Sequence, residues 1–536
     1  MMKYSLSLRN ILQRSKDLFP SKEIFSKGRA NDVRYTYADY YMRVCRLANA
    51  LKRLGVNAGD RVGTLAWNHH RHMELYLAVP CCGAVLHTLN LRLFQDQLAY
   101  AINHADDKVI FLDDDLIPLL ERIKDRLGKV KQFIIMSDAN SLPPTTLSPA
   151  VSYEQLLSEA AAAFEFPETD EWSPAAMCYT TATTGDPKGV AYTHRSIYLH
   201  SLLLGLADTM ALSEKDVMMP IVPMFHVNAW SLPFAATWLG AKQVFPRERL
   251  DGRSLCQLIE SERVTITGGV PTILASIYHY LESGAKHDLS SLRKVICGGS
   301  ALPRSLIEGF RKKYGITLTH GYGMTETSPL VTLCNLKSHM ENWPEEKIVD
   351  VLAKQGTLAP GLEMKLVNDD GAKVAHDGKT PGEILLRGPW IAGEYYNEPE
   401  KTAQTMGDGW LHTGDIATVD PEGYIQIVDR KKDLIKSGGE WISSVNLENS
   451  IMAHPDVREA AVIGVPHEKW QERPMAFVVL KKEAAGKLTQ KDILDFLKAK
   501  VAKWWIPDAV VFLDEIPKTS VGKFDKKLLR QKHIAK

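Results

Sequence analysis

The sequence has almost no net charge, because 65 lysines and arginines face 64 aspartates and glutamates and leave +1. Chains that bind nucleic acid or an anionic membrane over a wide surface usually carry a basic excess. Nucleic acid and membrane are therefore not expected as the main partner, although a local basic patch is still allowed. Compositional bias is also lacking, since 45% hydrophobic and 24% charged residues is the ordinary globular mix. That mix excludes a disordered tail, a collagen-like chain and a coiled coil.

Cysteines are few and show no metal-binding pattern. There are seven, an odd number, and none forms a CxxC or Cys/His ligand spacing, so neither a disulfide framework nor a structural zinc is expected. The segment Met1–Arg14 lacks the long apolar core of a signal peptide. The most apolar early stretch, Leu75–Leu91, is broken by Pro80, His87 and Asn90, which indicates buried core rather than a membrane span. We expect a reduced, cytoplasmic protein without a transmembrane segment.

The length points to several domain-sized units. At about 150 residues per domain, 536 residues make roughly three to four, which favours a large enzyme or multi-domain machine. Helical and strand-like apolar patterns alternate along the chain, which predicts an α/β fold. The expected helices are within Thr36–Val62, Leu116–Leu127 and Gln490–Val501, and the expected strands are Val62–Trp67, Val109–Asp113, Gln132–Met136, Ala175–Tyr179, Lys242–Phe245 and Lys294–Cys297.

Two changes in amino-acid composition along the chain suggest domain boundaries. Gly356–Tyr396 is rich in glycine, proline and β-forming residues and predicts a small antiparallel or β-barrel-like subdomain. The segment from Tyr424 to Asp433 concentrates charged and turn residues and predicts a linker. We therefore expect a large N-terminal domain of α/β subdomains, residues 1–428, and a small α+β C-terminal domain.

The strongest local motif is Tyr179–Val190, which reads Y-T-T-A-T-T-G-D-P-K-G-V directly after an expected strand. Threonine hydroxyls, backbone N–H groups and Lys188 suit a phosphate cradle. A Walker loop is excluded because GxxxxGK[ST] is absent. The alternative is a polar surface turn, because Gly-Asp-Pro is a good turn sequence.

This motif resembles the phosphate loop of the adenylate-forming superfamily, T-S-G-T-T-G-x-P-K-G, with Thr181 and Ala182 as departures. Threonine keeps the hydroxyl, whereas alanine loses freedom at positive φ. The superfamily includes acyl-CoA synthetases, luciferases and peptide-synthetase adenylation domains. Further segments resemble its motifs in the same order, and the resemblance runs from about Tyr35 to Arg530. They are 223–226, 298–300, 321–326, 410–415, 429–433 and 517–523.

The resemblance implies an ATP site in which Tyr322 stacks on adenine, Thr325 approaches the α-phosphate, and Asp415 and Arg430 bind the ribose. The residues assigned to ATP or AMP are Thr180, Thr181, Thr183, Thr184, Gly185, Lys188, Gly298, Gly299, Ser300, His320, Gly321, Tyr322, Gly323, Met324, Thr325, Asp415, Ile427 and Arg430. Glu326 would hold Mg²⁺ together with Thr184, because a hard cation prefers oxygen ligands.

Three segments look closer to bacterial medium- and long-chain fatty acyl-CoA synthetases and to the related methylmercaptopropionate-CoA ligases: Val222–Trp230, Lys436–Ser444 and Trp470–Pro474. This resemblance implies that Trp230 gates a fatty-acid tunnel. The implied acyl pocket comprises Phe225, His226, Trp230, Gly299 and Trp441, and the implied catalytic residues are Lys523, His226 and Thr325. The residues implied for coenzyme A and the hinge are Lys432, Lys436, Ser437, Gly438 and Gly439.

The expected function is an ATP-dependent carboxylic acid–CoA ligase. The acid would attack the α-phosphorus of ATP to give an acyl-adenylate and pyrophosphate, and the CoA thiol would then release AMP. The resemblance implies that a mobile C-terminal domain, residues 433–536, rotates between the two steps about a hinge at 429–432. It also implies a homodimer.

Several alternatives remain open. The acid could be a short thioether acid such as 3-methylthiopropionate, or an aryl acid, instead of a fatty acid. A luciferase-like oxygenase and a non-catalytic nucleotide-binding protein are more distant readings. Taken singly, Phe225, His226 and Tyr322 could be core residues, and Arg430–Lys432 could be a solvated charge run.

Overall fold

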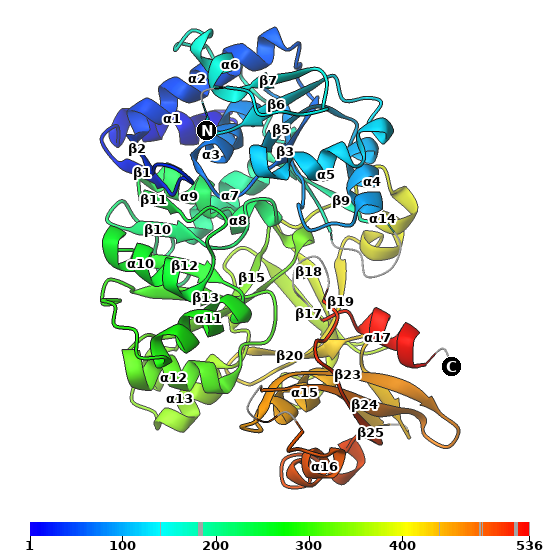
Figure 1. Ribbon diagram of the computed structural model, residues 1–536. Helices are drawn as coiled ribbons and strands as arrows, with labels where there is room; N and C mark the ends of the chain where they lie inside the picture. The colour runs from blue at the N-terminus through cyan, green and yellow to red at the C-terminus, as the bar shows by residue number, and fades with distance from the viewer. Residues whose placement is uncertain are drawn as a thin grey trace. The chain divides into compact units, whose positions relative to one another are not determined.

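The computed structural model describes residues 1–139, 141–180, 186–438, 440–481, 484, 486–518 and 524–534. Contacts divide this chain into two compact units (Figure 1). The first unit comprises residues 1–180, 186–363 and 387–411, and the second comprises 364–386 and the described part of 412–536. The predicted boundary and hinge at 428–433 stay predictions.

The N-terminal part of the first unit is built on a sheet of seven described strands in the order β7-β6-β5-β3-β4-β8-β9. Strands β7 to β8 run parallel, and β9 pairs antiparallel with β8. Their bounds are β3 Arg61–Leu65, β4 Val85–Thr88, β5 Asp107–Asp113, β6 Gln132–Met136, β7 Ala150–Ser152, β8 Pro174–Tyr179 and β9 Gly189–Thr193.

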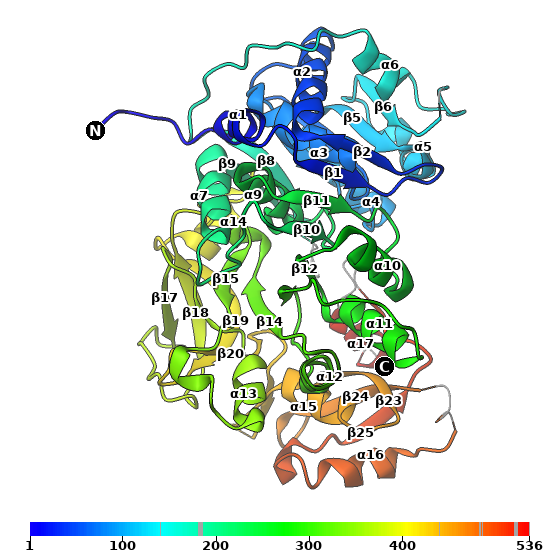
Figure 2. The same ribbon diagram turned by 90° about the vertical axis from the view of Figure 1, so that its left-hand side faces the viewer.

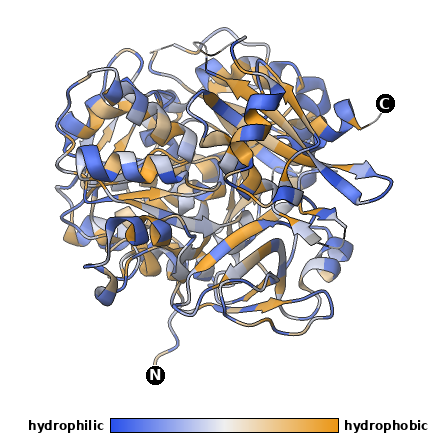
Figure 3. Cartoon of the chain, turned by 90° about the horizontal axis from the view of Figure 1, so that it is seen from below, coloured by the Kyte–Doolittle hydropathy of each residue, from blue (hydrophilic) through white to orange (hydrophobic). Residues whose placement is uncertain are grey.

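Helices cover both faces of this sheet, and the two-residue period of the strands explains why. On β5, Val109 and Phe111 pack into the cluster that contains α2 (Tyr37–Arg53) and α3 (His70–Cys81). Ile110 and Leu112 point to the opposite face and pack against α4 (Gln95–Ala105) and α5 (Ile117–Glu121). Strands buried on both faces read as continuous apolar runs. Figure 3 colours the chain by hydropathy, and many strands inside the molecule are orange, the colour of apolar residues.

A second sheet of the first unit has nine described strands in the order β16-β15-β14-β13-β12-β10-β11-β1-β2. Strands β14, β13, β12, β10, β11 and β1 run parallel, and helices α10, α11 and α12 lie along one side of it (Figure 2). The strand bounds are β1 Glu23–Ser26, β2 Val33–Thr36, β10 Val217–Pro220, β11 Lys242–Phe245, β12 Ile266–Gly269, β13 Lys294–Cys297, β14 Leu318–Gly323, β15 Leu330–Leu333 and β16 Thr357–Leu358.

The remaining helices of the first unit pack around these sheets. Their bounds are α1 Leu8–Leu18, α6 Tyr153–Ser158, α7 His194–Leu204, α8 Val227–Trp230, α9 Leu232–Leu239, α10 Gly252–Glu262, α11 Pro271–Glu282, α12 Arg304–Tyr314, α13 Glu345–Leu352 and α14 Pro399–Met406. No helix of the described chain is long and apolar enough to cross a membrane.

The second unit holds two smaller sheets. The first sheet has the strand order β17-β18-β19-β20; three of its terminal residues, Glu363, Arg387 and Leu411, are counted in the first unit. The other sheet has the order β22-β21-β24-β23, with β25 beside β24. The bounds are β17 Glu363–Val367, β18 Gly382–Arg387, β19 Leu411–Val419, β20 Ile425–Arg430, β21 Ile435–Ser437, β22 Glu440–Ile442, β23 Val457–His467, β24 Gln471–Leu480, β25 Ala509–Phe512, α15 Ser444–Met452, α16 Gln490–Leu497 and α17 Lys526–His533.

The structure confirms the α/β class and the expected strands, and it corrects two local predictions. The helix expected over Leu116–Leu127 is only α5, Ile117–Glu121, with 3₁₀ turns on either side. Pro118 lies in the first turn, the one helical position where its missing N–H is harmless. The linker expected from Tyr424 is also wrong over 425–430, which form β20. Ile425 and Asp429 are buried there while the polar Gln426 is exposed, a strand alternation that the charged residues concealed.

Candidate active site

The predicted phosphate loop leaves the carboxyl end of β8 and returns as β9. Its base is closed by two hydrogen bonds: the Thr180 N–H donates to the Lys188 carbonyl at 2.9 Å, and the Lys188 N–H donates to the Thr180 hydroxyl at 3.2 Å. Lys188 is therefore held beside the end of a parallel strand, where α/β proteins bind ligands. Four predicted phosphate-binding residues, Thr181, Thr183, Thr184 and Gly185, lie outside the described residues.

Three other predicted segments meet at one edge of the nine-stranded sheet. Phe225 and His226 follow β10, Gly298–Ser300 follow β13, and Tyr322–Glu326 end β14. These strands are parallel neighbours through β12, so their carboxyl ends share an edge. The sequence motifs are thus brought together by topology.

The backbone at the end of β14 packs tightly against the segment that follows it. A Cβ on Gly323 would lie 2.0 Å from the carbonyl oxygen of Pro329, so only glycine fits there. The following 3₁₀ turn, Thr325–Thr327, carries Thr325 and Glu326, both more than nine-tenths buried. Backbone bonds brace it: the Tyr192 hydroxyl donates to the Thr325 carbonyl at 2.8 Å, and the Ala392 N–H donates to the Glu326 carbonyl at 2.8 Å.

His320 joins β14 to the turn after β13. Its Nδ1 lies 3.1 Å from the Ala353 carbonyl and its Nε2 lies 3.3 Å from the Ser300 carbonyl. Burial lowers the pKa of His320, so the ring is neutral at pH 7 and has a single N–H, which can donate to only one of these two carbonyls. Gly321 pairs with Leu333 of β15, and the Met324 N–H donates to the Thr327 hydroxyl at 3.0 Å.

One residue at this site was missed by the sequence analysis. The hydroxyl of Tyr395 donates to Glu326 Oε1 at 2.7 Å, and the Lys188 ammonium lies 4.4 Å from the centre of the same ring. Tyr395 falls in the Gly- and Pro-rich segment that predicted only β structure. No spacing in that segment signals a site, because both partners come from distant parts of the chain.

The segment that carries Trp230 has an unusual backbone. From Val227 to Ser231 every residue has φ between +48° and +58°, a left-handed turn without glycine. Such conformations cost L-residues roughly 1–2 kcal/mol each and persist only where the surroundings impose them. The indole of Trp230 lies against two glycines, since a Cβ on Gly268 or Gly298 would be 3.3 or 3.1 Å from it.

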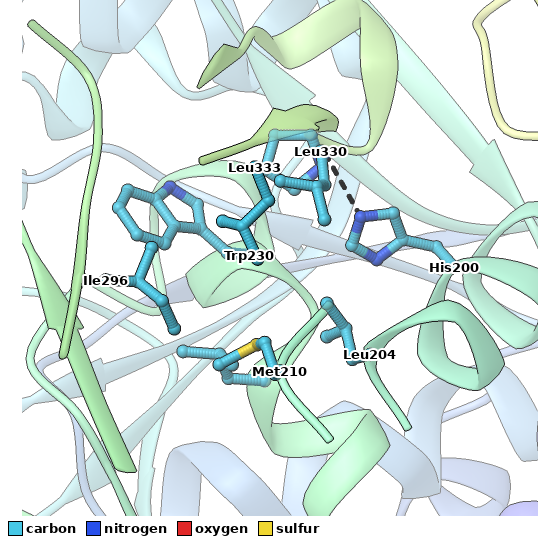
Figure 4. A pocket seen from close by; sticks show the side chains of 9 residues that line it. His200, Leu204, Met210, Trp230, Ile296, Leu330 and Leu333 are labelled. Carbon is cyan, nitrogen blue, oxygen red and sulfur yellow. Dashed lines mark hydrogen bonds between the residues drawn. The ribbon is translucent and has the colours of Figure 1, made fainter. Parts of the chain in front are cut away.

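Behind Trp230 lies an apolar cavity of about 30 Å³ (Figure 4). Its walls are His200, Leu204, Met210, Trp230, Leu232, Ile296, Pro329, Leu330 and Leu333. The imidazole of His200 accepts the Leu330 N–H through Nε2 at 3.1 Å, and burial lowers its pKa to about 3, so it is neutral. Apart from Trp230, none of these wall residues belonged to a recognised motif.

The predicted ribose residues lie in the second unit. Asp415 on β19 is opposite Arg430 on β20, and Asp415 Oδ1 is 3.0 Å from Arg430 Nε. Ile427 lies on the same strand, opposite Ala417. Asp429, the first residue of the predicted hinge, is buried, and its Oδ2 accepts the Ser444 N–H at 2.6 Å. Lys432 is exposed in the turn after β20.

The residues predicted for coenzyme A lie in the hairpin of β21 and β22. The Lys436 ammonium is 4.4 Å from the centre of the Trp441 ring, and Arg473 donates to the Ser437 hydroxyl at 3.0 Å. Gly438 has a φ of +62°, and its N–H donates to the Trp470 carbonyl at 2.9 Å. Gly439 and the predicted catalytic Lys523 lie outside the described residues.

The donor set fits magnesium better than a transition metal. The described chain holds no group of three or more His, Cys, Asp or Glu side chains that could bind a metal ion. Glu326 offers one hard carboxylate, and Mg²⁺ commonly binds through one or two carboxylates with phosphate oxygens and waters completing the shell.

Comparisons with known proteins point to one family. Residues 12–396 match the model of the AMP-binding enzymes, and residues 446–523 match the AMP-binding enzyme C-terminal domain. A long-chain-fatty-acid–CoA ligase from Thermus thermophilus is 50% identical, with 99% of this chain and 96% of that one covered. A 3-methylmercaptopropionyl-CoA ligase from Ruegeria lacuscaerulensis is 45% identical, with 90% and 89% covered.

Solved structures show the same architecture. The crystal structure of the anthranilate CoA ligase AuaEII with anthranoyl-AMP is 26% identical and superposes with a TM-score of 0.88, over 99% of this chain and 98% of that one. A Mycobacterium tuberculosis fatty acyl CoA synthetase is 30% identical with a TM-score of 0.74, over 99% of both chains. The chain therefore belongs to the AMP-binding enzyme family, among its AMP-forming acyl-CoA ligases.

Proposed function

We propose that this ligase activates a medium- or long-chain fatty acid. The fatty carboxylate attacks the α-phosphorus of ATP, so that an acyl-adenylate forms and pyrophosphate leaves. The thiol of CoA then attacks the acyl carbon, the thioester forms, AMP leaves and the thiol proton passes to solvent.

The observation that carries the choice of acid is the cavity behind Trp230. Its walls are apolar, and an apolar cavity excludes water and accepts hydrocarbon. The 50% and 41% identities to long-chain and medium-chain fatty-acid–CoA ligases support the same choice. The present space of about 30 Å³ holds roughly two water-sized groups, so a longer chain requires the indole of Trp230 to turn away.

The residues of the site work by position and charge rather than by acid–base chemistry. Lys188 and the threonine-rich loop would bind the β- and γ-phosphates, Tyr322 would stack on adenine, and Asp415 with Arg430 would bind the ribose. Lys523 would bridge the carboxylate and the α-phosphate. When bound at Glu326 and Thr184, Mg²⁺ would neutralise charge on the leaving pyrophosphate.

The thioester step would use the second face of the C-terminal domain. We propose that rotation about 429–432 moves Lys523 away and brings the hairpin of Lys436–Gly438 toward the pantetheine arm of CoA. A hinge needs only a few residues that absorb the change in φ and ψ. The half-reactions test this division: Lys523→Ala should abolish pyrophosphate release but spare thioester formation from preformed acyl-adenylate, and equal loss of both would contradict it.

A short thioether acid is the second candidate. The small cavity with Trp230 in its present position and the 45% identity to a 3-methylmercaptopropionyl-CoA ligase both favour it. The two candidates differ in whether the indole must move.

The test is CoA-dependent AMP formation with straight-chain acids from about three to eighteen carbons and with 3-methylthiopropionate. For a fatty-acid ligase, kcat/KM should rise with chain length by about tenfold for each two buried methylenes. Trp230→Ala should increase the preference for long chains over short ones, because a long chain no longer has to displace the indole, whereas the exposed Trp172→Ala should leave the preference unchanged. A maximum at 3-methylthiopropionate would replace the fatty-acid assignment with the thioether one.

A further inference from the structure

Tyr395 stands between two oppositely charged residues of the site. Its side chain is buried, and it follows the segment that braces Glu326 through the Ala392 N–H. Lys188 and Glu326 make no ion pair with each other in the described part of the chain; each contacts Tyr395 instead.

The contact with Glu326 orients a carboxylate. The Tyr395 hydroxyl donates a hydrogen bond to the Glu326 carboxylate. The bond of 2.7 Å to Oε1 engages one carboxylate oxygen. It thereby fixes the rotation of the group that would face a cation.

The contact with Lys188 places an ammonium. The Nζ atom lies 4.4 Å from the ring centre, within the range of a cation–π interaction. This attraction is weaker and less directional than a direct ion pair with a carboxylate. An ammonium resting on a ring can therefore transfer to phosphate oxygens without first breaking a salt bridge.

The backbone of Tyr395 is itself held on both sides. Its N–H donates to the Thr402 hydroxyl on α14 at 2.9 Å, and the next N–H, of Tyr396, donates to the Gly189 carbonyl at 2.9 Å. Gly189 adjoins Lys188 in the chain. Together with the bond from the Ala392 N–H to the Glu326 carbonyl, these contacts tie the backbone around Tyr395 to the segments of Lys188 and Glu326 and to α14.

We propose that Tyr395 is a positioning residue for ATP. It keeps the Lys188 ammonium and the Glu326 carboxylate apart, so that Lys188 stays available to the β- and γ-phosphates and Glu326 to the cation. The proposal rests on the proposed function only in taking Lys188 and Glu326 as the groups that bind Mg²⁺ and ATP.

Two substitutions separate the two contacts. Tyr395→Phe removes the hydroxyl and keeps the ring, and Tyr395→Leu removes both. Binding is measured by titration calorimetry with ATP at a series of Mg²⁺ concentrations, with ATP in EDTA, and with AMP. AMP serves as the internal control because it lacks the phosphates that Lys188 would bind. Tyr396→Phe is the matched control variant.

Tyr395→Phe is expected to raise the Mg²⁺ concentration at half-maximal ATP binding by about tenfold, the effect of one hydrogen bond to a charged group. Its affinities for AMP and for ATP in EDTA should stay within about twofold of the parent. Tyr395→Leu should also weaken ATP binding in EDTA, by roughly three- to tenfold. Tyr396→Phe should match the parent in all three titrations.

An unchanged Mg²⁺ requirement in Tyr395→Phe overturns the proposal. So does a parallel loss of AMP and ATP affinity, because a merely structural role would affect both ligands alike. Since no acid or CoA is present, a wrong assignment of the acid leaves this result intact, and the acid panel detects that error separately. A parent protein that does not bind ATP overturns both proposals.

Discussion

The carboxylate of Asp415 contacts the guanidinium of Arg430, with 3.0 Å between Oδ1 and Nε, across the antiparallel pair of β19 and β20. Asp415 is buried, whereas the Arg430 side chain is 46% exposed. A buried carboxylate paired with an arginine keeps a fixed orientation. Two hydroxyls of a ribose are a suitable partner for a carboxylate that is oriented in this way.

Asp415→Asn tests this assignment. The amide keeps the shape but loses the charge, so the hydrogen bonds from ribose hydroxyls should weaken by about 1.5–3 kcal/mol and the KM for ATP should rise roughly 10- to 100-fold. The parent should discriminate between ATP and its 2′,3′-dideoxy analogue, and the variant should discriminate far less. Steady-state kinetics with both nucleotides gives this ratio. An unchanged ratio would place the ribose elsewhere.

The sequence predicted the α/β class and six of the described parallel strands, because strands buried on both faces have continuous apolar runs. Lys242–Phe245 and Lys294–Cys297 match β11 and β13 at both ends. It failed at β20, whose exposed positions are polar, and at residues 116–127, where the helix has Pro118 in its first turn and ends at Glu121.

The sequence predicted the parts of the candidate site whose residues lie in contiguous motifs. Segments such as 298–300 and 321–326 carry their own pattern, and parallel topology brings them to one edge of the sheet. The walls of the cavity and Tyr395 were not predictable, since their apolar or aromatic side chains acquire a role only through contacts made across the fold. The roles of the motif residues, and the homodimer, stay predictions.

Gly323→Ala should disrupt the site locally. The added Cβ would lie 2.0 Å from the Pro329 carbonyl oxygen, so the end of β14 must move and carry Tyr322 and Glu326 with it. We expect ATP and AMP affinity to fall by at least about tenfold, because displacements near 1 Å commonly cost that much or more. Gly393→Ala is the control, since its Cβ would meet no atom within 4 Å. Equal nucleotide affinity in both variants would contradict the close approach.

Asp216 should make stability depend on pH. Burial alone raises the pKa of Asp216, but hydrogen bonds from Arg293 and Thr265 outweigh it and hold the pKa below its ordinary value. A carboxylate with a lowered folded pKa stabilises the protein above its unfolded pKa, about 4, and this contribution disappears as pH falls through the folded value. Asp216→Asn should therefore cost about 2 kcal/mol at pH 7 and progressively less below about pH 4.

Urea unfolding of the parent and Asp216→Asn between pH 7 and pH 3 measures this difference. Asp495→Asn is the control, because its pair with Lys498 is solvent-exposed and such pairs contribute little. A stability difference for Asp216→Asn that stayed constant down to pH 3 would show that folding does not lower the pKa of this carboxylate.

The left-handed turn beside the apolar cavity should respond to glycine in the opposite way to a helix. Ala229 has a φ of +48°, where alanine is disfavoured by roughly 1–2 kcal/mol relative to glycine, whereas Ala235 lies in the right-handed helix α9, where glycine costs about 1 kcal/mol. Both methyl groups are fully buried, so their loss affects the two variants similarly. Ala235→Gly should therefore unfold at lower urea concentration than Ala229→Gly, by the equivalent of about 2–3 kcal/mol. If Ala229→Gly were the less stable variant, the turn that carries Trp230 would not be strained in this way. Strain in the turn could then not help to move the indole, and an acyl chain that displaced it would have to supply the free energy through its own burial.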